Sequence, residues 1–232
     1  MDEGGGADTR RAHGESEQSS AARQRFHDPA RVVALSDGVF AIIMTLLVLD
    51  IRVPELSQGQ SLAGALQQVR PTLTAFVVSF VLAGMYWVGH RDLFALVRQT
   101  DRGLVWLNIL FLLPLCLLPF AASLIGRYDR DPVALRIYGL ILLAIAVMRL
   151  LIWLYGTRRP HLLSTRLDDR QRRAGLALAV FPGLAYLLAI LLCAVAPALS
   201  LGIFAGLPLL YFLSITVLRR DRKGDREYSE FT

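Results

Sequence analysis

Apolar residues occur along this chain in long blocks, and charged residues are concentrated between the blocks. From Ala174 to Leu218 there are 45 consecutive residues without a charge, and from Gly103 to Gly126 there are 24. A helix needs about 20 predominantly apolar residues to cross the hydrocarbon core of a bilayer. The runs are longer than the helix of a soluble core requires, so the pattern predicts membrane-spanning helices.

Capping residues, prolines and the ends of the uncharged runs predict the helix boundaries. Asp28-Pro29 and Asp131-Pro132 each combine a capping acid with a proline at the first helical position. The 45-residue run has to fold back once, and Ala196-Pro197 is the natural break. The second helix has its uncharged core from Pro71 and could begin near Ser61, with Pro71 as a kink. The six predicted helices cover residues 28–51, 71–89, 103–125, 131–156, 172–194 and 198–218.

The distribution of lysine and arginine predicts how these helices are oriented. Nineteen of these residues fall in the two tails and in the loops after the second and fourth helices, against four in the other loops. Basic residues mark the cytoplasmic side of a membrane protein. We therefore expect an all-α integral membrane protein with six transmembrane helices per subunit and both termini in the cytoplasm.

Composition supports a membrane protein and excludes other classes. The chain is 54% hydrophobic and 19% charged, with a mean hydropathy of +0.47, which is outside the usual range of soluble domains. The net charge of +6 lies between apolar blocks, so we expect no nucleic-acid partner. Cys116 and Cys193 both lie in apolar runs and predict neither a disulfide nor a metal pair. Residues 1–30 lack the apolar stretch of a cleavable signal peptide.

These patterns divide the chain into three parts. Residues 1–27 are polar and predict a disordered tail. Residues 28–218 form the expected six-helix transmembrane domain, and residues 219–232 a basic cytoplasmic tail.

The first helix differs from the others because two acids interrupt it. Only 12 uncharged residues separate Asp37 from Asp50, too few to cross about 30 Å of hydrocarbon. This helix can span only if it carries Asp37 into the bilayer, where a carboxylate needs a partner or water. Depth along the helices suggests Asn108, Arg149 and His90 as candidate members of the same polar layer, with Trp106 half a turn before Asn108.

A second face of the first helix is almost wholly apolar. At 100° per residue, Ile42, Thr45 and Leu49 fall on one stripe with Leu46 beside it, and Asp37 lies about 140° away. Periodicity alone does not distinguish a packing stripe from the lining of a pore.

The sequence lacks several motifs of other membrane proteins. It contains no glycine-rich phosphate loop, no carbonyl selectivity filter on a re-entrant loop, no periodic arginine sensor and no metal-spaced His/Cys cluster. No nucleophile has an identifiable base, so we expect neither an enzyme nor a cofactor or metal site.

The first three predicted helices carry motifs in a recognisable order. The string from Arg31 to Ile42 contains Arg31-x-x-x-x-Ser36-Asp37, and it resembles the first helix of the prokaryotic transmembrane-protein-175 family, whose motif reads Arg-x-x-x-Phe-Ser-Asp. Later elements agree with that family: Tyr86-Trp87-x-x-His90, Leu93-Phe94, Asp101, Trp106-Leu107-Asn108-Ile109-Leu110-Phe111 and Leu118-Pro119-Phe120. Leu35 stands where the motif has phenylalanine, which removes ring packing but no chemistry.

The resemblance implies a potassium-permeable channel, a homotetramer of six-helix subunits in the cell membrane of a prokaryote. It implies that the first helix of each subunit lines the pore, with K+ as the permeant ion. Its site residues would be the apolar constriction residues Ile42, Leu46 and Leu49, the selectivity residue Thr45, and the motif network of Arg31, Ser36, Asp37, His90, Trp106 and Asn108.

Two other functions remain open from the residues alone. One is a proton-coupled secondary transporter in which Asp37 is the titrating carboxylate. The other is a membrane-embedded assembly protein without transport activity. Large single-channel currents would distinguish a channel from both.

Overall fold

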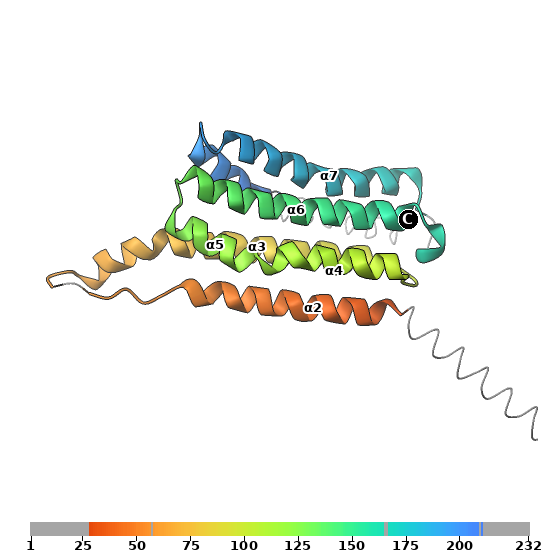
Figure 1. Ribbon diagram of the computed structural model, residues 1–232, viewed down its shortest axis with the longest axis horizontal. Coiled ribbons are helices and arrows are strands. Elements are labelled where there is room, and N and C mark those ends of the chain that lie inside the picture. Colours follow the sequence, from red (N-terminus) through yellow and green to blue (C-terminus); the bar gives the residue numbers. More distant parts are fainter. Residues whose placement is uncertain (1–27, 57, 165–166, 209, 211–232) are drawn as a thin grey trace, which may run out of the picture.

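The helices of the protein lie side by side in a bundle, seen here in a computed structural model that describes residues 28–56, 58–164, 167–208 and 210 (Figure 1). In chain order they are α2 (Pro29–Leu46), the short 3-10 helix η1 (Leu47–Asp50), α3 (Leu62–Phe94), α4 (Arg102–Cys116), α5 (Leu118–Arg127), α6 (Pro132–Thr157), the 3-10 turn η2 (Pro160–Leu162), α7 (Asp169–Leu192) and the helix Pro197–Pro208.

Five helical segments in this part of the chain are long and apolar enough to cross a membrane, with α2–η1 and α4–α5 each counted as one segment. The described chain is thus that of an all-helical integral membrane protein. The helix Pro197–Pro208 is shorter. The remainder of the predicted sixth helix and the predicted tails, residues 1–27 and 219–232, lie outside the described residues.

A side-chain cap begins each of the long helices. A polar side chain accepts a hydrogen bond from a backbone N–H in the first turn of each. These capping residues are Asp28, Ser61, Asp101, Asp131 and Asp168. The caps confirm the predicted starts after Asp28 and Asp131, and the earlier of the two possible starts for the second helix.

Three predicted boundaries were wrong. The fifth helix begins at Asp169 and not at residue 172, because Asp168 and Gln171 form a capping box before the apolar run. The second helix continues past Gly89 to Phe94, because Arg91 and Asp92 are exposed and remain helical beyond the apolar run. The third helix is broken at Leu117 into α4 and α5. Pro119 has no N–H to donate to the carbonyl four residues earlier, so the regular ladder cannot continue there.

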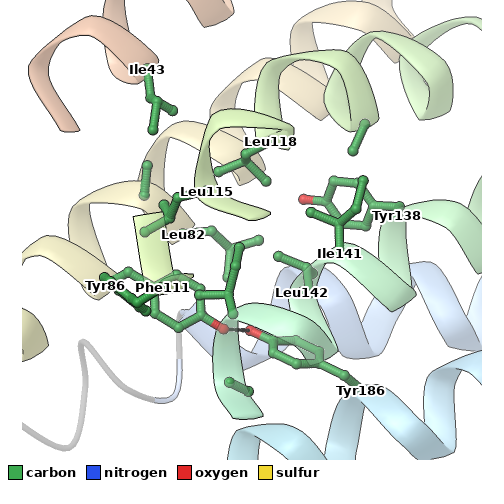
Figure 2. Close-up of a cluster of buried hydrophobic side chains, with 14 of the residues drawn as sticks. Ile43, Leu82, Tyr86, Phe111, Leu115, Leu118, Tyr138, Ile141, Leu142 and Tyr186 are labelled. Carbon is green, nitrogen blue, oxygen red and sulfur yellow. Dashed lines mark hydrogen bonds between the residues drawn. The ribbon is translucent and has the colours of Figure 1, made fainter. Parts of the chain in front are cut away.

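Buried tyrosines join α3 to the second half of the bundle. The Tyr86 hydroxyl donates to that of Tyr186 at 3.1 Å, and Figure 2 shows this bond among packed leucine and isoleucine side chains. The hydroxyls of Ser79 and Tyr138 lie 3.0 Å apart. Each pair satisfies polar groups that would otherwise be costly to bury in an apolar core.

The loops predicted to be cytoplasmic meet at one end of the bundle. Backbone bonds pair residues 96–98 with residues 162–164: Arg98 N donates to Leu162 O and Ser164 N to Leu96 O, both at 2.8 Å. Next to this pairing, Asp101 accepts from the Leu104 amide at 2.8 Å, the Tyr155 hydroxyl at 2.9 Å and Arg159 at 2.6 Å. Burial opposes ionisation of Asp101, but these donors and the Arg159 charge outweigh it and hold the pKa of the carboxyl below its ordinary value.

Candidate functional site

Helix α2 has two faces with different surroundings. Val32, Ser36, Phe40 and Ile43 are buried and recur at intervals of three or four residues, so they form one stripe of the helix. This stripe packs against the rest of the bundle, while α2 itself is an outer helix (Figure 1).

The opposite face of α2 is not covered by the described part of this chain. Ile42 is 58% exposed and Leu49 is 70% exposed, and Thr45 and Leu46 between them are exposed as well. The apolar stripe expected from the sequence therefore lies on the free side of the helix. The described residues of a single subunit leave this face available to a neighbour, a lipid or a water-filled path.

Thr45 directs its proton into its own helix. Its Oγ1 lies 2.8 Å from the carbonyl oxygen of Ile42 and 3.1 Å from that of Ala41. A hydroxyl has one proton and two lone pairs. Because the helix backbone takes the proton, the lone pairs remain available to a donor or a cation on the exposed side.

A buried polar cluster attaches α2 to α3 and α4. The Asn108 amide donates from Nδ2 to Ser36 Oγ at 2.9 Å, and Ser36 Oγ lies 2.9 Å from the Val32 carbonyl, to which it donates. His90 Nε2 lies 2.8 Å from Asn108 Oδ1, which accepts in the tautomer that carries the proton on Nε2. These contacts join Ser36, His90 and Asn108, all predicted site residues, into one cluster of three helices.

Aromatic rings enclose the imidazole of this cluster. The His90 ring stacks on Phe94 at 4.5 Å and on Phe111 at 5.5 Å between centroids, and Phe40 of α2 lies 6.0 Å away at a tilt. His90 Nδ1 is buried and has no hydrogen-bond partner among the described residues. The cluster is thus a small polar core within an apolar shell, which fixes the rotation of α2 about its axis.

Asp37 lies outside the buried cluster. It is exposed, and its Oδ1 accepts a hydrogen bond from the indole Nε1 of Trp87 at 2.8 Å. The guanidinium of Arg91 lies 5.7 Å from the centre of the same indole. The sequence pattern did not single out Trp87 as a site residue, although it lies three residues before His90, on nearly the same side of α3.

Three other candidate residues are placed away from the cluster. Trp106 is 63% exposed and Arg31 is exposed, and no hydrogen bond within the described part of the chain includes either side chain. Arg149 does not join the expected polar layer: its Nη1 donates to the carbonyl of Leu178, and its guanidinium packs against Gly89. Among the described residues, no group of three or more His, Cys, Asp or Glu could hold a metal ion.

The fold and the site together define a class of protein. It is an all-helical integral membrane protein in which a buried polar cluster holds one helix against the bundle. The other face of that helix is apolar, carries one hydroxyl and is free of contacts within the described residues. Known proteins of one family are similar to this chain. The family model described as the endosomal/lysosomal potassium channel TMEM175 matches residues 31–119.

Individual relatives match over a greater length. A potassium channel of Streptomyces collinus is 36% identical over 189 residues, which cover 80% of this chain and 92% of that protein. The chain belongs to the TMEM175 family, a family of ion channels and not of enzymes.

A solved structure and an animal relative extend this comparison. The crystal structure of a lysosomal potassium-selective channel TMEM175 homologue from Chamaesiphon minutus superposes with a TM-score of 0.72 at 31% identity, over 80% of this chain and 97% of that one. The human endosomal/lysosomal proton channel TMEM175 is 29% identical over 81% of this chain, and the match spans 36% of the human protein.

Proposed function

We propose that this protein is a potassium-permeable cation channel, with a pore lined by α2 from each of several identical subunits. The observation that carries this proposal is the exposed face of α2: the described residues of the same chain leave Ile42, Thr45, Leu46 and Leu49 uncovered. A helix held firmly on one face by Ser36, and free on the other, is suited to line an axis shared with copies of itself. The family relationship and the names of the bacterial relatives support K+ as the permeant ion.

In this proposal Ile42, Leu46 and Leu49 form apolar constrictions and Thr45 forms a layer of hydroxyls between them. Rings of apolar side chains oppose wetting of a narrow pore. Each Thr45 hydroxyl donates its proton to the backbone of α2. Its oxygen can therefore replace part of the hydration shell of a cation. Hydroxyls hold an ion less tightly than a cage of carbonyls, so the preference for K+ over Na+ is modest.

The proposed channel also has a defined assembly, membrane topology and division into domains. The channel is a homotetramer in the cell membrane of a prokaryote, with six helices per subunit and both termini in the cytoplasm. Residues 28–218 form the channel domain between the polar tails 1–27 and 219–232. Arg31, Asp37 and Trp106 act with the buried cluster of Ser36, His90 and Asn108 at the cytoplasmic half of the pore helix.

The decisive experiment is ion flux through the purified protein in liposomes, measured with K+, Na+ and H+ gradients. We expect K+ flux above Na+ flux in wild type, and single-channel currents in planar bilayers. Saturating, slow, proton-linked flux that Asp37→Asn abolishes would instead identify the transporter. A stable oligomer with no flux would identify an assembly protein.

Thr45 provides a matched pair of variants. Thr45→Ala removes the hydroxyl and should reduce the K+/Na+ preference, whereas Thr45→Ser keeps the hydroxyl and should preserve it. The readout is the reversal potential under bi-ionic conditions, and identical values for Thr45→Ala and wild type would reject the selectivity role.

A further inference from the structure

The end of the candidate pore helix changes its geometry. After Leu46 the α-helix tightens into the 3-10 turn η1, which has three residues per turn in place of 3.6. The direction of Leu49 therefore depends on how η1 is held. Leu47 in the same turn is buried, while Leu49 is more exposed than Ile42 or Leu46, the other apolar residues of the free face.

An ion pair holds the last residue of η1. Arg127 Nη2 donates to Asp50 Oδ1 at 3.1 Å, and the Asp50 side chain is only 24% exposed. The second carboxylate oxygen, Oδ2, is buried without a hydrogen-bond partner among the described residues. Arg127 is thus the group that offsets the Asp50 charge within the described part of the chain, immediately beside Leu49.

The base of Arg127 is itself fixed to α3. The preceding residue, Gly126, accepts a hydrogen bond at its carbonyl from the Thr72 hydroxyl at 3.3 Å. A Cβ on Gly126 would lie 3.1 Å from the Thr72 Cα, so a larger residue would require α5 and α3 to move apart by a few tenths of an ångström. A continuous line of contacts therefore runs from Thr72 through Gly126 and Arg127 to Asp50.

We propose that Asp50 and Arg127 are positioning residues for the pore: their ion pair anchors η1 to α5 and sets the position of the Leu49 constriction. This inference rests on the proposed function, because it assigns a purpose to the pair only if Leu49 lines a conduction path. The residues act through Leu49 and do not themselves bind the permeant ion.

The test measures K+ flux of liposomes containing Asp50→Asn, Arg127→Gln or the exchanged pair Asp50→Arg/Arg127→Asp. Each single variant should raise basal K+ flux about fivefold, equivalent to about 1 kcal/mol, which is what a partly exposed ion pair can contribute. The exchanged pair should return the flux toward wild type. Asp92→Asn is the matched control, because it removes the exposed Arg91–Asp92 ion pair, far along the chain from η1.

A second readout reports position without conduction. Leu49→Cys, in a Cys116→Ser background that removes the exposed native thiol, is labelled with a membrane-impermeant thiol reagent. Adding Arg127→Gln should change the rate at which the introduced thiol is labelled about fivefold, as for the flux. Adding Asp92→Asn should leave that rate unchanged.

The outcomes separate the two proposals. Unchanged flux and unchanged labelling in a conducting protein overturn the positioning role and leave the channel intact. Absence of K+ flux in wild type overturns the proposed channel and, with it, this inference. Raised flux that the exchanged pair does not reverse also overturns the ion-pair role.

Discussion

Arg149 and Leu178 are joined by a hydrogen bond from the guanidinium Nη1 to the backbone carbonyl oxygen, at 3.1 Å. Pro182 lies four residues after Leu178 within α7 and has no N–H to donate to that carbonyl, as another residue would in a regular helix. Arg149 of α6 supplies the donor that α7 lacks. The Arg149 guanidinium, which is costly to place within a membrane, thus has a structural role that is separate from the polar cluster at Asn108.

We expect Arg149→Met to lower the free energy of unfolding by about 1 kcal/mol, because the Leu178 carbonyl is then left without a donor. In a Pro182→Ala background the helix can donate to this carbonyl itself, so the cost of Arg149→Met should fall. Thermal unfolding in detergent across this double-mutant cycle is the measurement.

Arg136→Met is the control for that cycle. Arg136 lies on the same helix, and its Nε donates to Cys193 Sγ instead. The loss of unfolding free energy caused by Arg136→Met should be the same with and without the Pro182→Ala substitution. Equal costs of Arg149→Met in both backgrounds would show that the two helices are not coupled through Leu178.

Asn108 is expected to be the most sensitive residue of the buried cluster. Asn108→Leu keeps the branched shape but removes the donor to Ser36 and the acceptor for His90, and a buried polar group left without a partner costs about 1–3 kcal/mol. The fraction of protein that elutes as a monodisperse oligomer, and its unfolding temperature, should both fall.

Trp87→Phe provides the comparison for Asn108→Leu. It removes the hydrogen bond to Asp37, which is exposed, so its effect on unfolding should be smaller. A loss for Trp87→Phe as large as that for Asn108→Leu would place the anchor of α2 at Asp37.

Replacing an apolar side chain of the free α2 face should increase conduction. Ile42→Asn introduces a group that water can wet, and in a pore gated by an apolar ring it should raise basal K+ flux. Ile42→Leu conserves apolar volume and should leave flux near wild type. Equal flux for all three proteins in liposomes would exclude Ile42 from the constriction.

The Asp101 interactions should make part of the stability dependent on pH. The pKa of Asp101 is lower in the folded state than its ordinary value of 3.8, so the ionised form stabilises the fold. That contribution is complete above pH 3.8 and is lost as the pH falls through the folded-state pKa.

Asp101→Asn keeps a side chain that can cap α4 but removes the charge facing Arg159. We expect a cost of about 0.5 kcal/mol at neutral pH, because the pair is partly exposed. The difference between the unfolding midpoints of wild type and Asp101→Asn, measured from about pH 7 to about pH 3, should begin to shrink once the pH is below 3.8. A constant difference across this range would contradict the assignment.

The sequence was informative about position along each helix. Capping acids located the starts of α2 and α6, and the Asp37–Asp50 interval identified α2 as the unusual helix. Similar depth correctly brought His90 close to Asn108. It also suggested Arg149 for the same layer, which the structure does not bear out, because equal depth does not require two side chains to face each other.

The sequence did not show which side of each helix faces its neighbours, that is, the rotation of the helix about its own axis. Trp106 and Asn108 are two residues apart, which turns them by about 200° on a helix, so the cluster includes one and not the other. Trp87, three residues from His90, meets Asp37 instead. These pairings depend on which faces of α2, α3 and α4 meet.

The sequence by itself determined that this chain crosses a membrane, where most of its helices begin, and that two acids interrupt the first of them. Only the tertiary structure decided that Phe40 and Ile43 face the bundle while Ile42 and Leu49 face away from it. The physical reason is that lipid is as apolar as a protein core. Hydrophobicity therefore does not distinguish the packed face of α2 from its free face, and the polar contacts of Ser36, His90 and Asn108 fix which is which.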